Sequence, residues 1–322
     1  RDAFVIADFD QRKTAILEGI NNLNKNGSGT AVIDNDLLEE VTALNEWPVP
    51  LLGKFDQHFL SVPQEALISS MKEHQKYFHM VDKNNNLLPA FITVANIESN
   101  NPQQVVDGNE RVIRPRLADA AFFYENDKLK TLESRRPLLK EIVFQAQLGS
   151  MYDKTHRIAA VAAGFATLID ADPDLVRRAA ELSKSDLVTD MVGEFDTLQG
   201  SMGRDYALHD GEDPQVAEAL FEQYLPRYAG DIIPVTKTGV ALALADRLDS
   251  LVGIFSIGQQ PSGSKDPFAL RRASLGVLRI LIEGEVDIDL GYLIQQAKAQ
   301  LQDFNSNDEG TEDVCEQVLT YV

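Results

Sequence analysis

The sequence lacks several features that would define a functional class. One cysteine, Cys315, occurs in 322 residues, which excludes an internal disulfide framework or a cysteine-based zinc site and is typical of a reducing cytoplasm. No apolar run approaches the roughly 18 residues of a membrane span, and the N-terminus lacks a signal-peptide pattern. A nucleophile elbow, a GxGxxG loop, an HExxH pair and the protein-kinase motifs are all missing. We therefore expect a cytoplasmic protein without a recognisable active site of its own.

Basic residues are also scarce. The chain has 30 Lys and Arg against 50 Asp and Glu, a formal charge of −20, which argues against DNA and against non-specific nucleic-acid binding. The charge is uneven. Residues 111–140 contain eight basic and four acidic residues, whereas residues 281–322 contain one basic and ten acidic residues. A polyanion would therefore have to be bound by local basic patches. The alternative for each patch is an ordinary solvated charged face.

The length suits about two domains. The chain begins with Arg1 and stops within a patterned stretch at Val322, so we expect a fragment of a longer protein. Residues 1–148 are predicted to form an α+β domain, a small sheet with helices. Capping residues at Asp8 or Asp10 and at Asp34 or Asn35 favour two early helices. Later elements are a strand at 59–62, a hairpin of strands 77–81 and 90–94, and helices 103–111, 115–124 and 129–147.

Residues 149–289 are predicted to form an all-α domain, and residues 290–322 the start of a truncated helical element. The expected helices are 153–169, 173–192, 214–224, 240–255 and 267–282. The stretch 181–206 combines an amphipathic pattern with Gly193, Gly200 and Gly203, which predicts a helix followed by a tight connection. Its density of polar residues indicates a site or an interface, or alternatively a buried helix with satisfied polar partners.

Two groups of basic residues are candidates for contact with phosphate. Arg111, Arg114 and Arg116 surround Pro115, where guanidinium groups suit phosphate or carboxylate ligands. Ion pairs within the chain, with Glu110, Asp119 and Glu125, explain them equally well.

The second group is Lys265, Arg271 and Arg272. They flank a predicted helix start with Asp266 as N-cap and Pro267 as first helical residue. The preceding loop 262–265 would offer backbone N–H groups to a phosphate, although capping alone also accounts for the pattern.

His156, Asp186 and Asp246 occur in an order that resembles the HD superfamily of metal-dependent phosphohydrolases. That family binds its ion with a His, an adjacent His-Asp pair and a distant Asp. Here the pair reads Ser185-Asp186, and a serine hydroxyl is a poor substitute for an imidazole ligand. We expect an HD-like helical scaffold without a metal site. A working metal-dependent phosphohydrolase is the alternative.

A set of strings extending over nearly the whole chain resembles the β subunit of bacterial glycyl-tRNA synthetase. The most specific are LQGSMGRDYA (198–207) and KDPFALRR (265–272); HQKYF (74–78), GNERVIRPRLADAAFF (108–123), KSDLVTDMVGEF (184–195) and ALADRLDSLVGIFSIG (243–258) accompany them. The resemblance implies an α2β2 ligase in which the α subunit forms glycyl-adenylate from glycine and ATP with Mg²⁺. It therefore implies no cofactor and no catalytic residue on this chain.

The same resemblance implies a fold and partners. The first half would be similar to part of the β subunit of phenylalanyl-tRNA synthetase, and the second half would be the HD-like domain. An anticodon-binding domain would follow. The expected partners are the α subunit and tRNA(Gly), with Arg111, Arg114, Arg116, Lys265, Arg271 and Arg272 as candidates for contact with the tRNA backbone. A pure scaffold that docks the α subunit is a further alternative.

Overall fold

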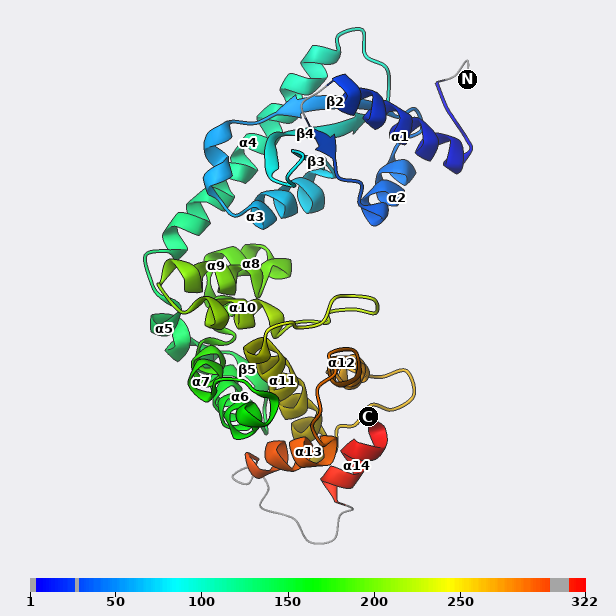
Figure 1. The fold of residues 1–322 in the computed structure, drawn as a ribbon. Coiled ribbons are helices and arrows are strands. Elements are labelled where there is room, and N and C mark those ends of the chain that lie inside the picture. Colours follow the sequence, from blue (N-terminus) through cyan, green and yellow to red (C-terminus); the bar gives the residue numbers. More distant parts are fainter. Residues whose placement is uncertain (1–3, 27–28, 302–312) are drawn as a thin grey trace. The chain divides into compact units, whose positions relative to one another are not determined.

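The computed structural model describes residues 4–26, 29–301 and 313–322, and shows a small antiparallel sheet with helices followed by a largely helical region (Figure 1). Contacts divide the chain into two compact units, Arg1–Asn126 and Asp127–Val322. None of the described helices is both long and apolar enough to cross a membrane. The order of an α+β part and then a helical part is the one expected from the sequence.

The sheet of the first unit has four strands in the order β1-β3-β4-β2, all paired antiparallel. The strands are β1 (Thr30–Ala31), β2 (Val49–Lys54), β3 (Phe78–Val81) and β4 (Leu87–Ala95). The predicted hairpin of β3 and β4 is confirmed, and the Asp82 carboxylate closes its turn by accepting the Asn86 N–H at 2.9 Å. β2 was not predicted as a strand. It lies at the sheet edge, where Pro50 is tolerated because an edge strand has unpaired backbone positions.

Four helices accompany this sheet: α1 (Phe9–Asn26), α2 (Asn35–Leu44), α3 (Gln64–Ser69) and α4 (Pro102–Asp127). The predicted acidic caps are confirmed, since Asp8 accepts the Gln11 N–H at 2.8 Å and Asp34 accepts the Leu37 N–H at 2.9 Å. α1 and α2 bury their apolar faces with β3 and β4 in a core that includes Ile16, Ile20, Leu38, Phe78 and Ile92.

The strand predicted at 59–62 is wrong. Gln57–Ser61 forms a 3₁₀ turn, because the Asp56 carboxylate accepts the His58 N–H and starts helical rather than extended backbone. The helices predicted at 103–111 and 115–124 are in fact the single helix α4, with Pro115 inside it. Proline removes one backbone hydrogen bond and normally breaks a helix. Here Pro115 is exposed, and burial of Ile113, Leu117 and Ala120 on the other side keeps the helix continuous.

The second unit is built around α11 (Lys237–Ser256), most of whose side chains are buried. α6, α7, α10, α12, α13 and α14 all contact it. The other elements are α5 (Leu132–Arg135), β5 (Val143–Gln145), β6 (Gly149–Ser150), α6 (Met151–Phe165), α7 (Pro173–Leu182), α8 (Asp190–Glu194), α9 (Ser201–His209), α10 (Pro214–Glu222), α12 (Leu270–Glu283), α13 (Leu290–Ala299) and α14 (Val314–Tyr321).

Two long helices predicted in this unit are wrong. Residues 129–147 form α5, a 3₁₀ turn at Arg136–Glu141 and the strand β5, since Pro137 cannot continue the backbone hydrogen bonding of α5. The helix predicted at 173–192 ends at Leu182. Lys184 has φ of 65°, a left-handed conformation that turns the chain into short segments before the unpredicted α9.

The two units divide between Asn126 and Asp127, earlier than the boundary predicted at 148/149. The physical reason is the buried Asp127 carboxylate, which accepts hydrogen bonds from the Arg135 guanidinium, the Met191 N–H and the Tyr206 hydroxyl. These bonds attach Asp127, the last residue of α4, to α5, α8 and α9. The range 290–322 contains α13 and α14, while 302–312 lie outside the described residues, so the predicted truncated helical element stays a prediction.

Candidate nucleic-acid interface

Arg111, Arg114 and Arg116 are all exposed on α4 in the first unit. Arg111 and Arg114 are three residues apart and share one side of the helix, whereas Arg116 lies on another side. Within the described parts of the chain, none of the three guanidinium groups has a hydrogen-bond or ion-pair partner. Glu110, one of the predicted partners, instead accepts the Lys54 N–H at 2.9 Å. The predicted ion pairs with Glu110, Asp119 and Glu125 are therefore absent, and the three cations face solvent.

Lys265, Arg271 and Arg272 lie around the start of α12 in the second unit and are also exposed. The helix begins at Leu270 rather than at Pro267. The N-cap residue is therefore Ala269 and not the predicted Asp266, although the Asp266 carboxylate still accepts the N–H groups of Leu270 at 2.8 Å and of Arg271 at 3.0 Å. In the preceding loop the backbone N–H groups of Ser262 and Lys265 donate to each other's carbonyl oxygens. Two of the four backbone N–H groups of the loop 262–265, which were predicted to be offered to a phosphate, are thus bonded within the loop itself.

The HD-like residues do not converge. His156 is exposed on α6, where its ring packs edge-on against Tyr152 at 4.6 Å. Asp186 is buried and accepts the Gly200 N–H at 2.6 Å. Burial raises the pKa of Asp186, only partly offset by that hydrogen bond. Across the described ranges, no group of three or more His, Cys, Asp or Glu side chains is arranged to hold a metal ion.

Asp246, on α11, has two lysine partners. Its Oδ1 lies 3.0 Å from the Lys154 ammonium and its Oδ2 lies 2.7 Å from the Lys184 ammonium. Lys154 also donates to Asp249 at 3.0 Å, and Arg157 donates to the same carboxylate at 2.6 Å. Cations and carboxylates thus alternate through the interior of the unit. Ammonium groups occupy the place beside Asp246 where an HD-type site would require a metal.

These buried charges shift one another's pKa values. Burial alone would raise the pKa of Asp246, but the two ammonium groups outweigh it and hold this pKa well below its ordinary value. Burial would also lower the pKa of Lys154, yet Asp246 and Asp249 raise it. For Lys184 burial prevails, and its pKa is lowered in spite of Asp246. Of the three charges on Asp246, Lys154 and Lys184, the charge on Lys184 is therefore the least well compensated by its surroundings.

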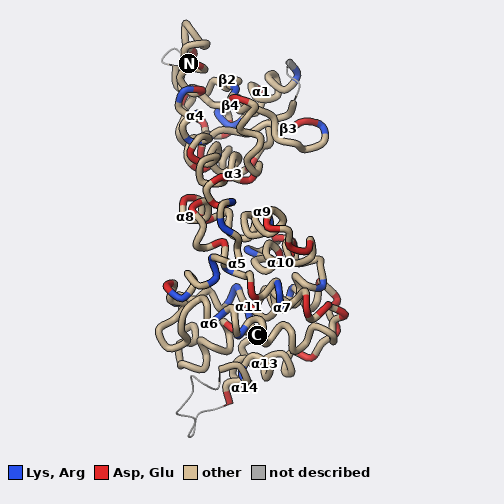
Figure 2. Tube along the Cα trace, turned by 90° about the vertical axis from the view of Figure 1, so that its left-hand side faces the viewer, with Lys and Arg blue, Asp and Glu red and all other residues tan. Residues whose placement is uncertain are grey.

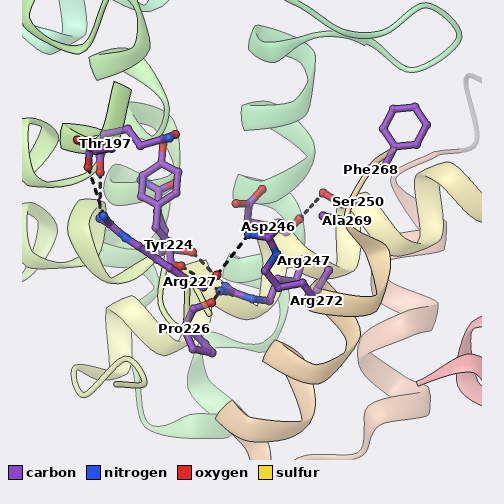
Figure 3. Close-up of a pocket in the computed structure, with 13 residues that line it drawn as sticks. Thr197, Tyr224, Pro226, Arg227, Asp246, Arg247, Ser250, Phe268, Ala269 and Arg272 are labelled. Carbon is purple, nitrogen blue, oxygen red and sulfur yellow. Dashed lines mark hydrogen bonds between the residues drawn. The ribbon is translucent and has the colours of Figure 1, made fainter. Parts of the chain in front are cut away.

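A cavity of about 490 Å³ lies against this network, between the end of α10, α11 and the start of α12 (Figure 3). Arg227, Arg247 and Arg272 line it from those three regions, together with Asp246 and apolar groups such as Phe268. Among the described residues the Arg247 guanidinium donates to four backbone carbonyls, from 3.0 to 3.3 Å. Burial lowers its pKa to about 10, so it stays charged at neutral pH. The cavity is therefore cationic in a protein whose net charge is −20.

The sequence prediction missed most of this network, although a signal was present. Lys154 and Arg157 are three residues apart on α6, and Asp246 and Asp249 are three apart on α11. Matched spacing of opposite charges is typical of two helices that face each other with paired side chains. Figure 2 shows this mixture, with basic and acidic segments close together in the second unit.

The chain matches one family model over its whole length. The model is described as glycyl-tRNA synthetase beta subunit, and it matches residues 1–322. A glycine–tRNA ligase beta subunit from Marinobacter nauticus is 61% identical over 299 residues, which cover 92% of this chain and 43% of that relative. Beta subunits from Hahella chejuensis and Chromohalobacter salexigens are 59% and 55% identical, over 92% and 99% of this chain and 43% and 46% of their own lengths. The chain thus spans less than half of these relatives.

Proposed function

The chain belongs to the glycyl-tRNA synthetase beta subunit family, and on that premise we propose that it is a tRNA-binding and assembly region of a glycine–tRNA ligase. Its partners in this proposal are tRNA(Gly) and the α subunit. The aminoacylation chemistry, with ATP and Mg²⁺, takes place on the α subunit, in the cytoplasm. The first unit corresponds to the part similar to the phenylalanyl-tRNA synthetase β subunit, and the second to an HD-like domain without hydrolytic chemistry.

The observation that carries the tRNA-binding role is the set of exposed guanidinium groups on α4. Arg111, Arg114 and Arg116 form no hydrogen bond or ion pair with the described residues, although Asp56 interacts electrostatically with Arg114, and all three lie on α4. Guanidinium groups that are not used internally suit the phosphate oxygens of a nucleic-acid backbone. The net charge of −20 repels polyanions elsewhere on the surface, so binding is restricted to such patches. Lys265, Arg271 and Arg272 provide a second patch of the same kind.

Binding of fluorescent tRNA(Gly) and of an unrelated tRNA, measured by anisotropy at several salt concentrations, tests this role. Replacing Arg111 and Arg114 together by Gln should weaken binding and reduce the salt slope by about 1 for each phosphate that is no longer neutralised. Lys83→Gln, which removes an exposed charge in the β3–β4 turn, is the matched control. If both variants weaken binding equally, or the double variant binds like the original chain, the α4 patch is not the interface. A chain that binds neither tRNA at any salt concentration would favour the docking-scaffold alternative.

The hydrolase alternative receives no support from the geometry. A metal at Asp246 would have to displace two ammonium groups that lie within 3.0 Å of its oxygens. Metal analysis after incubation with Mn²⁺ or Zn²⁺ should find no stoichiometric ion. A bound ion that disappears in Asp186→Ala would reverse this conclusion.

A further inference from the structure

Tyr228, in the loop between α10 and α11, is an exposed aromatic residue whose ring has no partner. It is 65% exposed, and its ring and hydroxyl make no ring contact or hydrogen bond with any residue that the structure describes. Phe4 and Phe122 are similarly exposed aromatic residues. Their rings, however, pack edge-on against those of Trp47 and Phe123. The Tyr228 ring lacks such a neighbour and is therefore available to a ligand.

The turn that carries Tyr228 is fixed by hydrogen bonds within the loop and to α12. The Asp231 N–H donates to the Tyr228 carbonyl at 3.2 Å, and Gly230 between them has φ of 85°. The Asp231 carboxylate accepts the Arg227 N–H at 2.7 Å. From α12, the Arg279 guanidinium donates to the Asp231 carbonyl at 2.7 Å. The backbone that carries the ring therefore has little conformational freedom to lose when a ligand binds.

Tyr228 lies next to the second basic patch, at the start of α12. The Arg272 guanidinium donates at 3.4 Å to the Arg227 carbonyl, which belongs to the peptide group that precedes Tyr228. Arg271 and Arg272 are both exposed. The carboxylate of the turn, that of Asp231, accepts two backbone N–H groups of its own loop, at 2.7 and 2.9 Å. Tyr228 therefore combines an exposed aromatic ring with neighbouring cations.

We propose that Tyr228 stacks on an unpaired base of the bound RNA while Arg271 and Arg272 contact its phosphates. This inference rests on the tRNA-binding role proposed above, and it adds a contact with a base to the phosphate contacts of that role. An aromatic ring beside guanidinium groups suits a single-stranded nucleotide, because the ring stacks on the base while the cations neutralise the phosphate. A base within a duplex is covered by the bases above and below it. Tyr228 thus directs this patch to an unpaired region of the RNA.

A protein partner is the alternative occupant, because Ile232 in the same loop and Ile282 on α12 are also exposed. These aliphatic side chains lie toward the end of α12. There Arg279 bonds to the backbone next to Ile232 and forms an ion pair with Glu283 at 2.7 Å. Tyr228 lies instead beside the exposed arginines at the start of the helix. The combination of a ring and cations at that end favours RNA.

Anisotropy titrations with tRNA(Gly) and with a blunt RNA duplex of similar length, at several salt concentrations, test the inference. The variants are Tyr228→Ala, Tyr228→Phe and the matched control Ile232→Ala, which removes a side chain that is 64% exposed from the same loop. We expect Tyr228→Ala to weaken tRNA(Gly) binding about tenfold through the loss of one stacked base. Its salt slope and its binding of the duplex should stay unchanged, because no phosphate contact is lost. Tyr228→Phe and Ile232→Ala should change the affinity less than about twofold.

The outcomes keep this inference apart from the proposed function. If Tyr228→Ala binds tRNA(Gly) like the original chain, while replacing Arg271 and Arg272 by Gln weakens binding, the patch contacts phosphates only and the stacking role is refuted. Equal losses in Tyr228→Ala and Ile232→Ala also overturn it. Weaker capture of the α subunit by Tyr228→Ala, with unchanged RNA affinity, identifies a protein interface instead. A chain that binds no RNA refutes the proposed function and this inference with it. Circular dichroism of each variant verifies that it folds.

Discussion

Replacing Asp246 should damage the second unit far more than replacing either of its lysine partners. Asp246→Asn removes the carboxylate that pairs with the Lys184 ammonium, whose side chain is only 5% exposed. Lys184 then keeps the face of the Tyr224 ring at 4.1 Å and a weaker electrostatic interaction with Asp186. Lys154 keeps Asp249 and the Ser250 hydroxyl. The variant therefore creates one poorly compensated buried charge.

The magnitude follows from the burial. Removing one partner of a buried ion pair costs about 3–5 kcal/mol, because the other charge is left without compensation. We expect a destabilisation of this size for Asp246→Asn. Lys184→Met should cost about 1 kcal/mol or less, because Asp246 keeps Lys154 and because burial already disfavours the charged form of Lys184. The double variant should be more stable than Asp246→Asn alone.

Urea denaturation followed by two probes measures this difference. Far-ultraviolet circular dichroism follows the helices, most of which belong to the second unit. The chain has one tryptophan, Trp47, and it lies in the first unit, so its fluorescence is an internal control that should not change. If Asp246→Asn costs no more than Lys184→Met, the two-lysine arrangement does not determine stability and the reasoning is refuted.

Three further predictions concern single groups. Burial raises the pKa of Tyr77 to about 12, and the Tyr77 hydroxyl donates a hydrogen bond to Asn109 at 2.6 Å. The contribution of Tyr77 to stability is therefore complete below about pH 10 and is lost as the pH rises toward 12. The difference in unfolding free energy between the original chain and Tyr77→Phe should shrink over that pH range. Asp127→Asn should lower the free energy of unfolding, measured by urea denaturation, by about 3–5 kcal/mol, because it removes a buried carboxylate that several donors share. A decrease below about 1 kcal/mol would contradict the role of Asp127 in attaching the end of α4 to the second unit. Gly239→Ala should lower stability by about 1–3 kcal/mol, since the added methyl group would overlap the buried Glu222 carboxylate; an unchanged melting temperature would show that Glu222 moves freely.

Local signals predicted local structure well. Asp8 and Asp34 begin helices because an acidic side chain accepts N–H groups two or three residues ahead, which depends on neighbouring residues only. The β3–β4 hairpin was predictable for the same reason, from a polar turn between apolar strands. The errors arose where tertiary packing overrode a local rule. Pro115 lies inside a continuous helix because the opposite side of α4 is buried, and no sequence window contains that information.

The sequence by itself determined the family and the order of an α+β part followed by a helical part. Each of these depends on identity or on short-range spacing. Only the tertiary structure decided that Asp246 forms ion pairs with Lys154 and Lys184, because these two lysines are 92 and 62 positions away in the chain. Periodicity places a residue on a face of a helix but does not say which other face it meets. The buried ion-pair network, the unpaired state of Arg114 and the cavity beneath Arg272 all depend on that choice of neighbours.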